Sequence, residues 1–219
     1  MSCHLLLVHG WGFGAGVWHP LLRLLSGVTP HALDLGYFGR SNLNMPAEPF
    51  IAVGHSLGFL WILNQLSNHP FATGCQGLVS INGFTCFVNT DTFPHGVPRR
   101  VLDRMRVRLS TNPVDVLTTF QRQAGMPNPL SIPPGLDIET LTQGLSWLIQ
   151  WEGQTALNQW RKPVLAIAAE DDSIVTPKMT RDSFNESVLH WVPAGGHLLL
   201  LTRPEVCAAQ IKDFMRAVS

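Results

Sequence analysis

The 219-residue sequence has few charged residues and no long hydrophobic run. Charged side chains make up 14% of the chain, and the fifteen basic residues balance the fifteen acidic ones. A net charge of zero gives no electrostatic case for binding nucleic acid or an anionic membrane surface. No apolar stretch approaches the roughly 20 residues needed to span a bilayer, and the N-terminus lacks the basic lead of a secretory signal. We therefore expect a cytoplasmic protein with no nucleic-acid or membrane partner.

The chain is also poor in cysteine. The four cysteines are Cys3, Cys75, Cys86 and Cys207, and no two of them form a C-x-x-C pair. Neither a zinc site nor a redox motif is therefore indicated. We expect reduced, buried thiols, as is usual in cytoplasmic proteins. The sequence implies no metal and no organic cofactor.

Hydrophobic residues make up 45% of the chain, enough to form a substantial core. In the first and last thirds, short apolar runs alternate with helical segments. This alternation predicts an α/β fold, in which a mostly parallel sheet is covered by helices on both faces. Strands are expected within residues 5–8, 32–35, 50–53, 78–81, 164–168 and 188–192. Helices are expected within 17–25 and 57–66, from Thr176-Pro177, and from a capping box at Thr202-x-x-Glu205.

The alternation stops between about Phe84 and Asn158. This stretch carries prolines between helical segments and contains no good strand. We expect residues 84–158 to form a helical cap, or lid, inserted into a core made of residues 1–83 and 159–219.

A nucleophile motif lies between the apolar strand at residues 50–53 and the apolar helix at 57–66. Gly54-His55-Ser56-Leu57-Gly58 fits G-x-S-x-G in the strand–turn–helix setting that the motif requires. A serine on so tight a turn has a strained backbone, and its neighbours two residues away must be small. The motif predicts that Ser56 is a nucleophile. The alternative is a helix N-cap flanked by incidental glycines.

A second glycine-containing motif, His9-Gly10-Trp11-Gly12, directly follows the first strand. Acyl transfer develops a negatively charged oxygen, which two preorganised backbone N–H groups can bind. The N–H groups of Leu57 and Trp11 are the expected donors. The alternative is that the glycines only terminate the strand. The Trp11 side chain would line the acyl pocket or simply pack.

The candidate base and acid follow two late strands. His197 lies on a glycine-rich turn, and an imidazole there can accept the Ser56 proton. A carboxylate after residues 164–168 can hold the imidazole in the required tautomer. Asp172 is favoured over Asp171 for this role, and the order Ser, Asp, His is the one expected for such a fold. The alternative for His197 is a structural histidine.

Together these residues resemble the α/β-hydrolase superfamily over essentially the whole chain. Within it, the closest resemblance is to the pimeloyl-acyl-carrier-protein methyl ester carboxylesterases of biotin synthesis. The resemblance rests on residues 9–12, 12–18, 34–41, 54–58, 86–87 and 195–197. It implies that Ser56, Asp172 and His197 are catalytic, that Trp11 and Leu57 form the oxyanion hole, and that Trp11 and Phe120 line the acyl pocket.

The sequence departs from that family in several places. Residues 34–50 are too few for the usual crossover helix, so an irregular crossover is expected. No hairpin is recognised before residues 5–8, where the family normally has one, so a shortened sheet is expected. Phe59 follows Gly58 where a second glycine is common.

Arg100, Arg104 and Arg108 are spaced four residues apart, which places them on one face of a helix. An acyl carrier protein is acidic, so this face is a candidate docking surface for it. The alternative is a solvated helix face with Asp103 as the partner of the arginines.

The leading functional hypothesis is hydrolysis of a carboxylic ester through an acyl-enzyme. The resemblance favours a pimeloyl-acyl-carrier-protein methyl ester as substrate. The alternatives are thioester or carbon–carbon bond hydrolysis of another small acyl substrate by the same triad, and a non-catalytic ligand receptor on the same fold.

Overall fold

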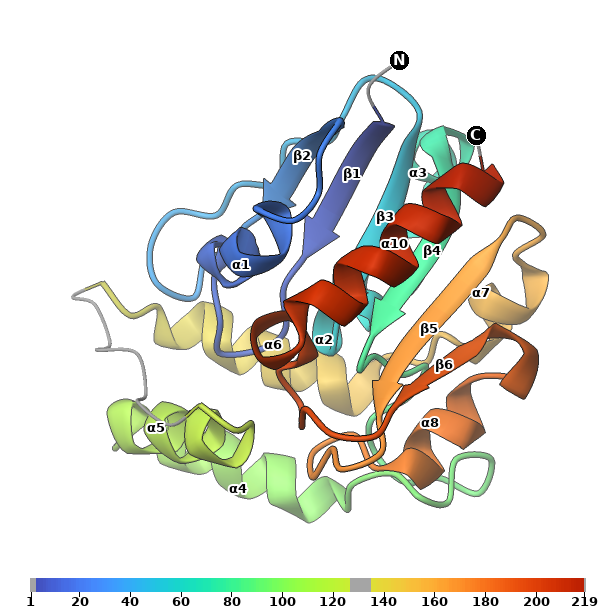
Figure 1. The fold of residues 1–219 in the computed structure, drawn as a ribbon. Helices are drawn as coiled ribbons and strands as arrows, with labels where there is room; N and C mark the ends of the chain where they lie inside the picture. Colours follow the sequence, from blue (N-terminus) through green and yellow to red (C-terminus); the bar gives the residue numbers. More distant parts are fainter. Residues whose placement is uncertain (1–2, 127–134, 219) are drawn as a thin grey trace.

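The computed structural model describes residues 3–126 and 135–218. In this part of the chain, six strands form one parallel sheet in the order β2-β1-β3-β4-β5-β6, which confirms the predicted α/β fold (Figure 1). The strands are β1 (Cys3–Val8), β2 (Val28–Leu33), β3 (Phe50–His55), β4 (Cys75–Ile81), β5 (Val164–Ala169) and β6 (Leu189–Val192). Residues 127–134 of the predicted cap lie outside the described residues.

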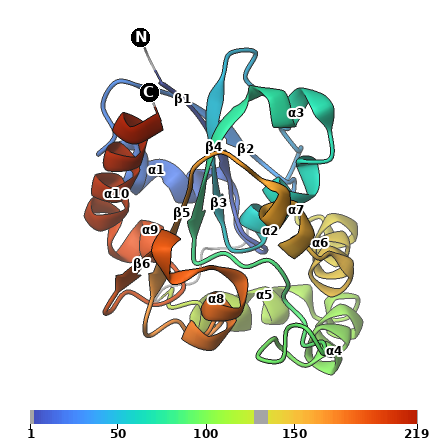
Figure 2. The same cartoon turned by 90° about the vertical axis from the view of Figure 1, so that its right-hand side faces the viewer.

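Helices cover both faces of the sheet (Figure 2). One face carries α1 (His19–Leu22), α9 (Leu199–Thr202) and α10 (Pro204–Val218), and the other carries α2 (Leu57–Gln65), α3 (His69–Gly74) and α7 (Gln154–Gln159). Because alternate strand residues point to opposite faces, Leu5 and Leu7 pack in the cluster of α9 and α10, whereas Leu6 and Val8 pack in the cluster of α2. β1 is therefore buried on both sides.

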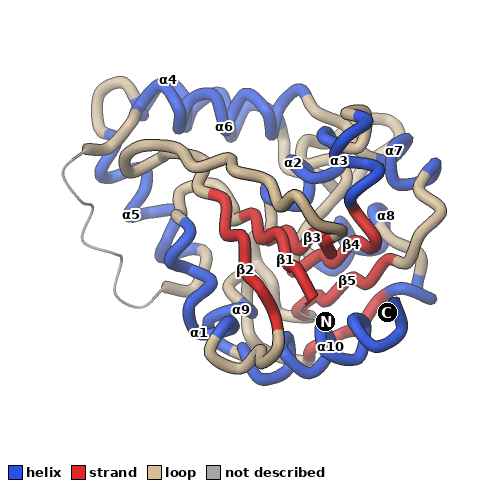
Figure 3. The backbone as a smooth tube through the Cα atoms, turned by 90° about the horizontal axis from the view of Figure 1, so that it is seen from above, coloured by secondary structure: helices blue, strands red, loops and turns tan. Residues whose placement is uncertain are grey.

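The chain between β4 and β5 runs through α4 (Arg99–Leu109), α5 (Pro113–Gln123), α6 (Ile138–Gln150) and α7. The strand arrows of β1 and β4 point toward α4 and α5, so these helices lie beyond the carboxyl ends of the strands (Figure 1). The view from above shows α4 and α6 side by side (Figure 3). Leu141, Leu145 and Leu148 of α6 join the apolar cluster of α2. Whether residues 84–158 form a separate cap domain stays a prediction.

The remaining elements are α8 (Pro177–Ser183) and two short 3₁₀ helices, Ala15–Trp18 and Glu186–Val188. Thr176 caps α8 by accepting a hydrogen bond from the Met179 N–H, as its place before Pro177 predicted. The crossover from β2 to β3 has no helix, also as predicted, and is held by an isolated bridge between Asp34 and Asn42. Within the described residues, no helix combines the length and apolarity needed to cross a membrane.

Two local predictions were wrong. The second strand occupies Val28–Leu33, not 32–35, because its pairing with the whole of β1 defines it despite Pro30, which an edge strand tolerates. The predicted capping box at Thr202 is absent. Thr202 instead ends α9, and its hydroxyl donates to the carbonyl of Gly195.

Candidate active site

Ser56 lies on the sharp turn between β3 and α2. Its backbone has φ 53° and ψ −124°, a combination that residues with a side chain rarely adopt. The flanking glycines make this turn possible. A Cβ at position 54 would lie 2.4 Å from the Phe59 Cα, and one at position 58 would lie 2.0 Å from the carbonyl oxygen of Val8.

Replacing Gly58 with alanine is expected to destabilise the protein by about 3 kcal/mol or more, because the new methyl group meets backbone that cannot rotate away. Urea unfolding would measure this loss. Gly16→Ala is the matched control, since a Cβ there would meet nothing closer than a His19 ring atom at 3.9 Å. Equal stability of the two variants would contradict this account of the turn.

His197 lies on the turn between β6 and α9, and its imidazole connects the two other candidate residues. Its Nε2 is 3.0 Å from the Ser56 Oγ, and its Nδ1 is 2.8 Å from the Asp172 Oδ2. The three residues are at most 6% exposed. A proton on Nδ1 donates to the carboxylate and leaves Nε2 free to accept the hydroxyl proton of Ser56. The arrangement therefore suits proton transfer from a serine nucleophile.

The two neighbouring aspartates have different partners. The other oxygen of Asp172 accepts hydrogen bonds from the N–H groups of Ile174 and Val175, at 2.8 and 2.9 Å, which fixes the carboxylate against the imidazole. The carboxylate of Asp171 instead accepts from the N–H groups of Gly195 and Gly196, at 2.9 and 2.8 Å. The structure thus brings Asp172, rather than Asp171, to the ring of His197.

The loop after β1 approaches Ser56 closely. A Cβ on Gly10 would lie 3.0 Å from the Cβ of Ser56. His9 holds this loop, because its Nε2 accepts from the Leu35 N–H at 3.0 Å and its Nδ1 therefore donates to the carbonyl of Gly10. Leu57 is the first residue of α2, where backbone N–H groups have no intrahelical acceptor. The loop after β1 and the start of α2 are therefore suited to binding an anion beside Ser56. The donor roles of the Trp11 and Leu57 N–H groups stay a prediction.

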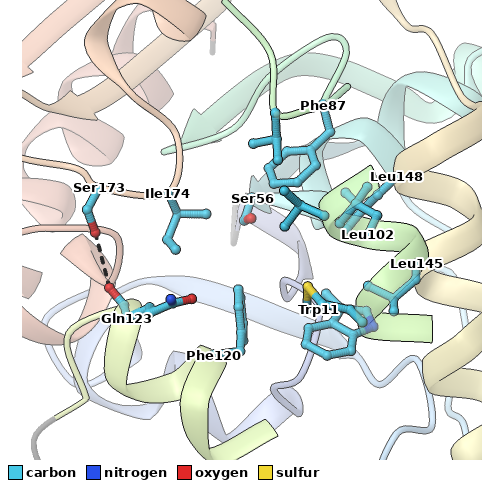
Figure 4. Close-up of a pocket in the computed structure, with 13 residues that line it drawn as sticks. Trp11, Ser56, Phe87, Leu102, Phe120, Gln123, Leu145, Leu148, Ser173 and Ile174 are labelled. Atoms are coloured by element: carbon cyan, nitrogen blue, oxygen red, sulfur yellow. Dashed lines mark hydrogen bonds between the residues drawn. The ribbon is translucent and has the colours of Figure 1, made fainter. Parts of the chain in front are cut away.

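An apolar cavity of about 340 Å³ opens beside Ser56 (Figure 4). The Trp11 side chain both lines it and packs: its indole N–H donates to the carbonyl of Leu141, and its ring meets the predicted pocket residue Phe120 edge to face at 5.0 Å. Most of the other walls are apolar, and Gln123 and Ser173 are polar lining residues. The further lining side chains include Phe87, Leu102, Met105, Leu145, Leu148 and Ile174.

Sequence reasoning missed the wall contributed by α4 and α6. Leu102, Met105 and Leu109 recur at helical spacing between arginines, and this pattern could have identified the inner face of α4. It could not have shown that Leu102 and Met105 face the cavity beside Ser56, since that depends on how the helix packs.

The arginine face of α4 is exposed, as predicted, but its members differ in their partners. Arg108 forms an ion pair with Asp115 of α5. Asp103 contacts Arg99 and Arg106, at 3.6 and 4.0 Å, and so does not neutralise the predicted face. Among the described residues, Arg100 and Arg104 have no ion-pair partner. A role in docking stays a prediction.

Comparisons with known proteins agree with this architecture. A family model described as "Alpha/beta hydrolase family" matches residues 5–210. The pimeloyl-[acyl-carrier protein] methyl ester esterase of Salmonella agona is 28% identical over 206 residues, which cover 81% of this chain and 79% of that protein. The biotin biosynthesis bifunctional protein of Cellvibrio japonicus is 24% identical over 98% of this chain, and the chain spans only 48% of that relative's length.

Among solved structures, an esterase from Exiguobacterium antarcticum superposes with a TM-score of 0.85 over 98% of this chain and 92% of that chain. The two sequences are 16% identical, so this likeness shows the shared fold and no more.

Proposed function

Because the chain belongs to the alpha/beta hydrolase family, we propose that it is a serine esterase in which Ser56 attacks a carboxylic ester. The observation that carries this proposal is the chain of contacts from Ser56 through His197 to Asp172, at 3.0 and 2.8 Å, beside an apolar cavity. A serine within hydrogen-bond reach of an imidazole that a third group orients is the arrangement typical of nucleophilic acyl transfer.

The proposed reaction has two halves. In the first, Ser56 Oγ bonds to the ester carbonyl carbon while its proton passes to His197 Nε2, and the N–H groups of Trp11 and Leu57 bind the resulting oxyanion. The intermediate then collapses, the imidazolium returns the proton to the departing alcohol, and an acyl-enzyme remains. In the second half, His197 takes a proton from a water whose oxygen bonds to the acyl carbon; the acyl–Oγ bond then breaks, the imidazolium returns the proton to Ser56 Oγ, and the acid leaves. Throughout, the Asp172 carboxylate stabilises the imidazolium.

The substrate we propose is a methyl ester of a medium-length acyl chain carried by an acyl carrier protein, and specifically the pimeloyl ester. The similarity to the pimeloyl-[acyl-carrier protein] methyl ester esterase of Salmonella agona supports this choice. The apolar cavity walls suit the methylene chain of such a substrate.

The exposed arginines of α4 support docking of an acidic carrier. Leu102 and Met105 of the same helix line the cavity, so a carrier protein bound to these arginines would lie close to the cavity. Because Arg108 is already paired with Asp115, Arg100 and Arg104 are the cations best able to bind a carboxylate of a partner protein.

We expect the double variant Arg100→Glu/Arg104→Glu to lower kcat/KM for a carrier-bound ester by about 10-fold or more, through charge repulsion, while sparing small soluble esters. Steady-state rates on both substrates would measure this. Arg23→Glu/Arg40→Glu is the control, because it makes the same charge change at exposed sites outside α4. Equal losses on the carrier-bound and the small ester would indicate damage to the helix and contradict docking.

Rates on a methyl ester, a p-nitrophenyl ester and a thioester of the same acyl group test the activity itself. The proposal predicts that the methyl ester is hydrolysed and that Ser56→Ala lowers this turnover by about 10⁴-fold or more. Preference for the thioester would assign a thioesterase instead, and folded protein without any turnover would favour a ligand receptor.

Expression of this protein in a biotin auxotroph that lacks its methyl esterase would test the pimeloyl substrate, and the proposal predicts that growth without biotin is restored.

A further inference from the structure

Asn82 lies on the turn that follows β4, and it is 1% exposed. Its φ is 46°, and among the described residues Ser56 is the one other non-glycine residue with a positive φ. Asparagine tolerates this left-handed conformation better than most residues. The turn directs its side chain toward the end of β5 and the loop that follows β6, where it makes its hydrogen bonds.

The Asn82 side chain joins the end of β5 to the loop that follows β6. Its Nδ2 donates to the carbonyls of Gly196 and His197, at 2.8 and 2.9 Å. Its Oδ1 accepts from the N–H of Ala169, the last residue of β5, at 2.9 Å. Both donor hydrogens and the carbonyl oxygen are thus used, as a buried amide requires. One side chain ties the backbone of the candidate base to the strand that leads into the loop of Asp172.

A second buried donor reaches the same carbonyl of His197. His55 Nε2 lies 2.9 Å from this oxygen. Burial first, and then the nearby His197 ring, lower the pKa of His55 well below its usual range, so the ring is neutral. Because a carbonyl can only accept, the single ring proton is on Nε2. The backbone of His197 is therefore held by two donors, from β3 and from the turn after β4.

We propose that Asn82 is a positioning residue, which holds the imidazole of His197 in register with Ser56 and Asp172 by fixing the backbone that carries it. The inference rests on the proposed catalytic role of His197. Loss of the amide would remove the Asn82 donor from the Gly196 carbonyl, leave His55 as the donor to the His197 carbonyl, and loosen the turn at Gly196. A displacement of the base by about 1 Å can cost about 100-fold in rate, even when substrate binding is unaffected.

Two variants remove the amide in different ways. Asn82→Gly deletes the side chain and keeps the backbone unstrained, because glycine adopts a φ of 46° freely. Asn82→Asp keeps the size and the acceptor for Ala169 N–H, but places an oxygen against the two carbonyls that Nδ2 now meets. We expect either variant to lower kcat on a small ester by about 10- to 100-fold with little change in KM.

Ser80→Ala is the matched control. Ser80 is also buried near the end of β4, and its hydroxyl accepts from the Gly83 N–H at 3.1 Å. Among the described residues, the Ser80 side chain forms no hydrogen bond to the loop of His197. This variant also removes a buried hydrogen bond, and it should keep the kcat of the parent. Thermal melting of all three variants gives the folded fraction by which each rate is normalised. The proposal would be overturned if the losses of kcat in the Asn82 variants disappear once rates are normalised to folded protein. It would also be overturned if Ser80→Ala loses as much kcat as the Asn82 variants.

A double-mutant cycle separates positioning from a merely structural role. If Asn82 acts through the imidazole, Asn82→Gly should lower the residual rate of His197→Ala no further. An additional loss of 10-fold or more in that background, or a rise in KM in place of a fall in kcat, would overturn the inference. Wild-type turnover in His197→Ala would instead refute the proposed function. An inactive His197→Ala together with a fully active Asn82→Gly would refute the positioning role alone.

Discussion

Replacing Ser56 with alanine is expected to lower kcat by about 10⁴-fold or more, and replacing His197 with alanine should have an effect of similar size. The two residues form one unit, because the hydroxyl is a weak nucleophile until the imidazole 3.0 Å away accepts its proton. The double variant should therefore be hardly worse than either single variant. Steady-state kinetics on a methyl ester would measure kcat for each.

Both variants should remain folded, since alanine removes only the reacting groups. Unchanged melting temperatures would establish this. Near-wild-type turnover in either folded variant would contradict the assignment of nucleophile and base. Fully additive losses in the double variant would contradict their action as one unit.

Replacing Asp172 with asparagine is expected to lower kcat by about 10⁴-fold. The amide would donate to His197 Nδ1 and so favour the tautomer with its proton on Nε2, which can no longer accept from Ser56. Kinetics on the same methyl ester would measure the loss.

Asp171→Asn is the control for this prediction, because it makes the same change in the adjacent carboxylate. Its amide oxygen can still accept from the Gly195 N–H, so we expect a far smaller loss. A larger loss in Asp171→Asn than in Asp172→Asn would reverse the assignment of the acid.

Much of the architecture was predictable from local patterns. Strand β3 with its Gly54 and helix α2 with its Gly58 are adjacent in the chain, so short-range sterics alone indicated the turn at Ser56. His197 was recognisable for a similar reason, because it follows a late strand on a glycine-rich turn. The sequence could also predict that these turns meet, since the carboxyl ends of parallel strands share one edge of a sheet.

Features that depend on tertiary packing were not predictable. Pro30 and polar neighbours concealed the start of β2, which is defined by pairing with β1. Thr202 matched a capping pattern, but its hydroxyl bonds to the carbonyl of Gly195 across a turn. Asn82 carries no motif of its own. Its importance follows from contacts with residues more than 80 positions away in the chain.

The most direct test of the account is to locate the residue that a fluorophosphonate probe modifies, by mass spectrometry of the labelled and digested protein. The account predicts one adduct, on Ser56, which forms far more slowly in His197→Ala. An adduct on another residue, or no adduct on folded wild-type protein, would contradict the claim that Ser56 is a nucleophile activated by His197.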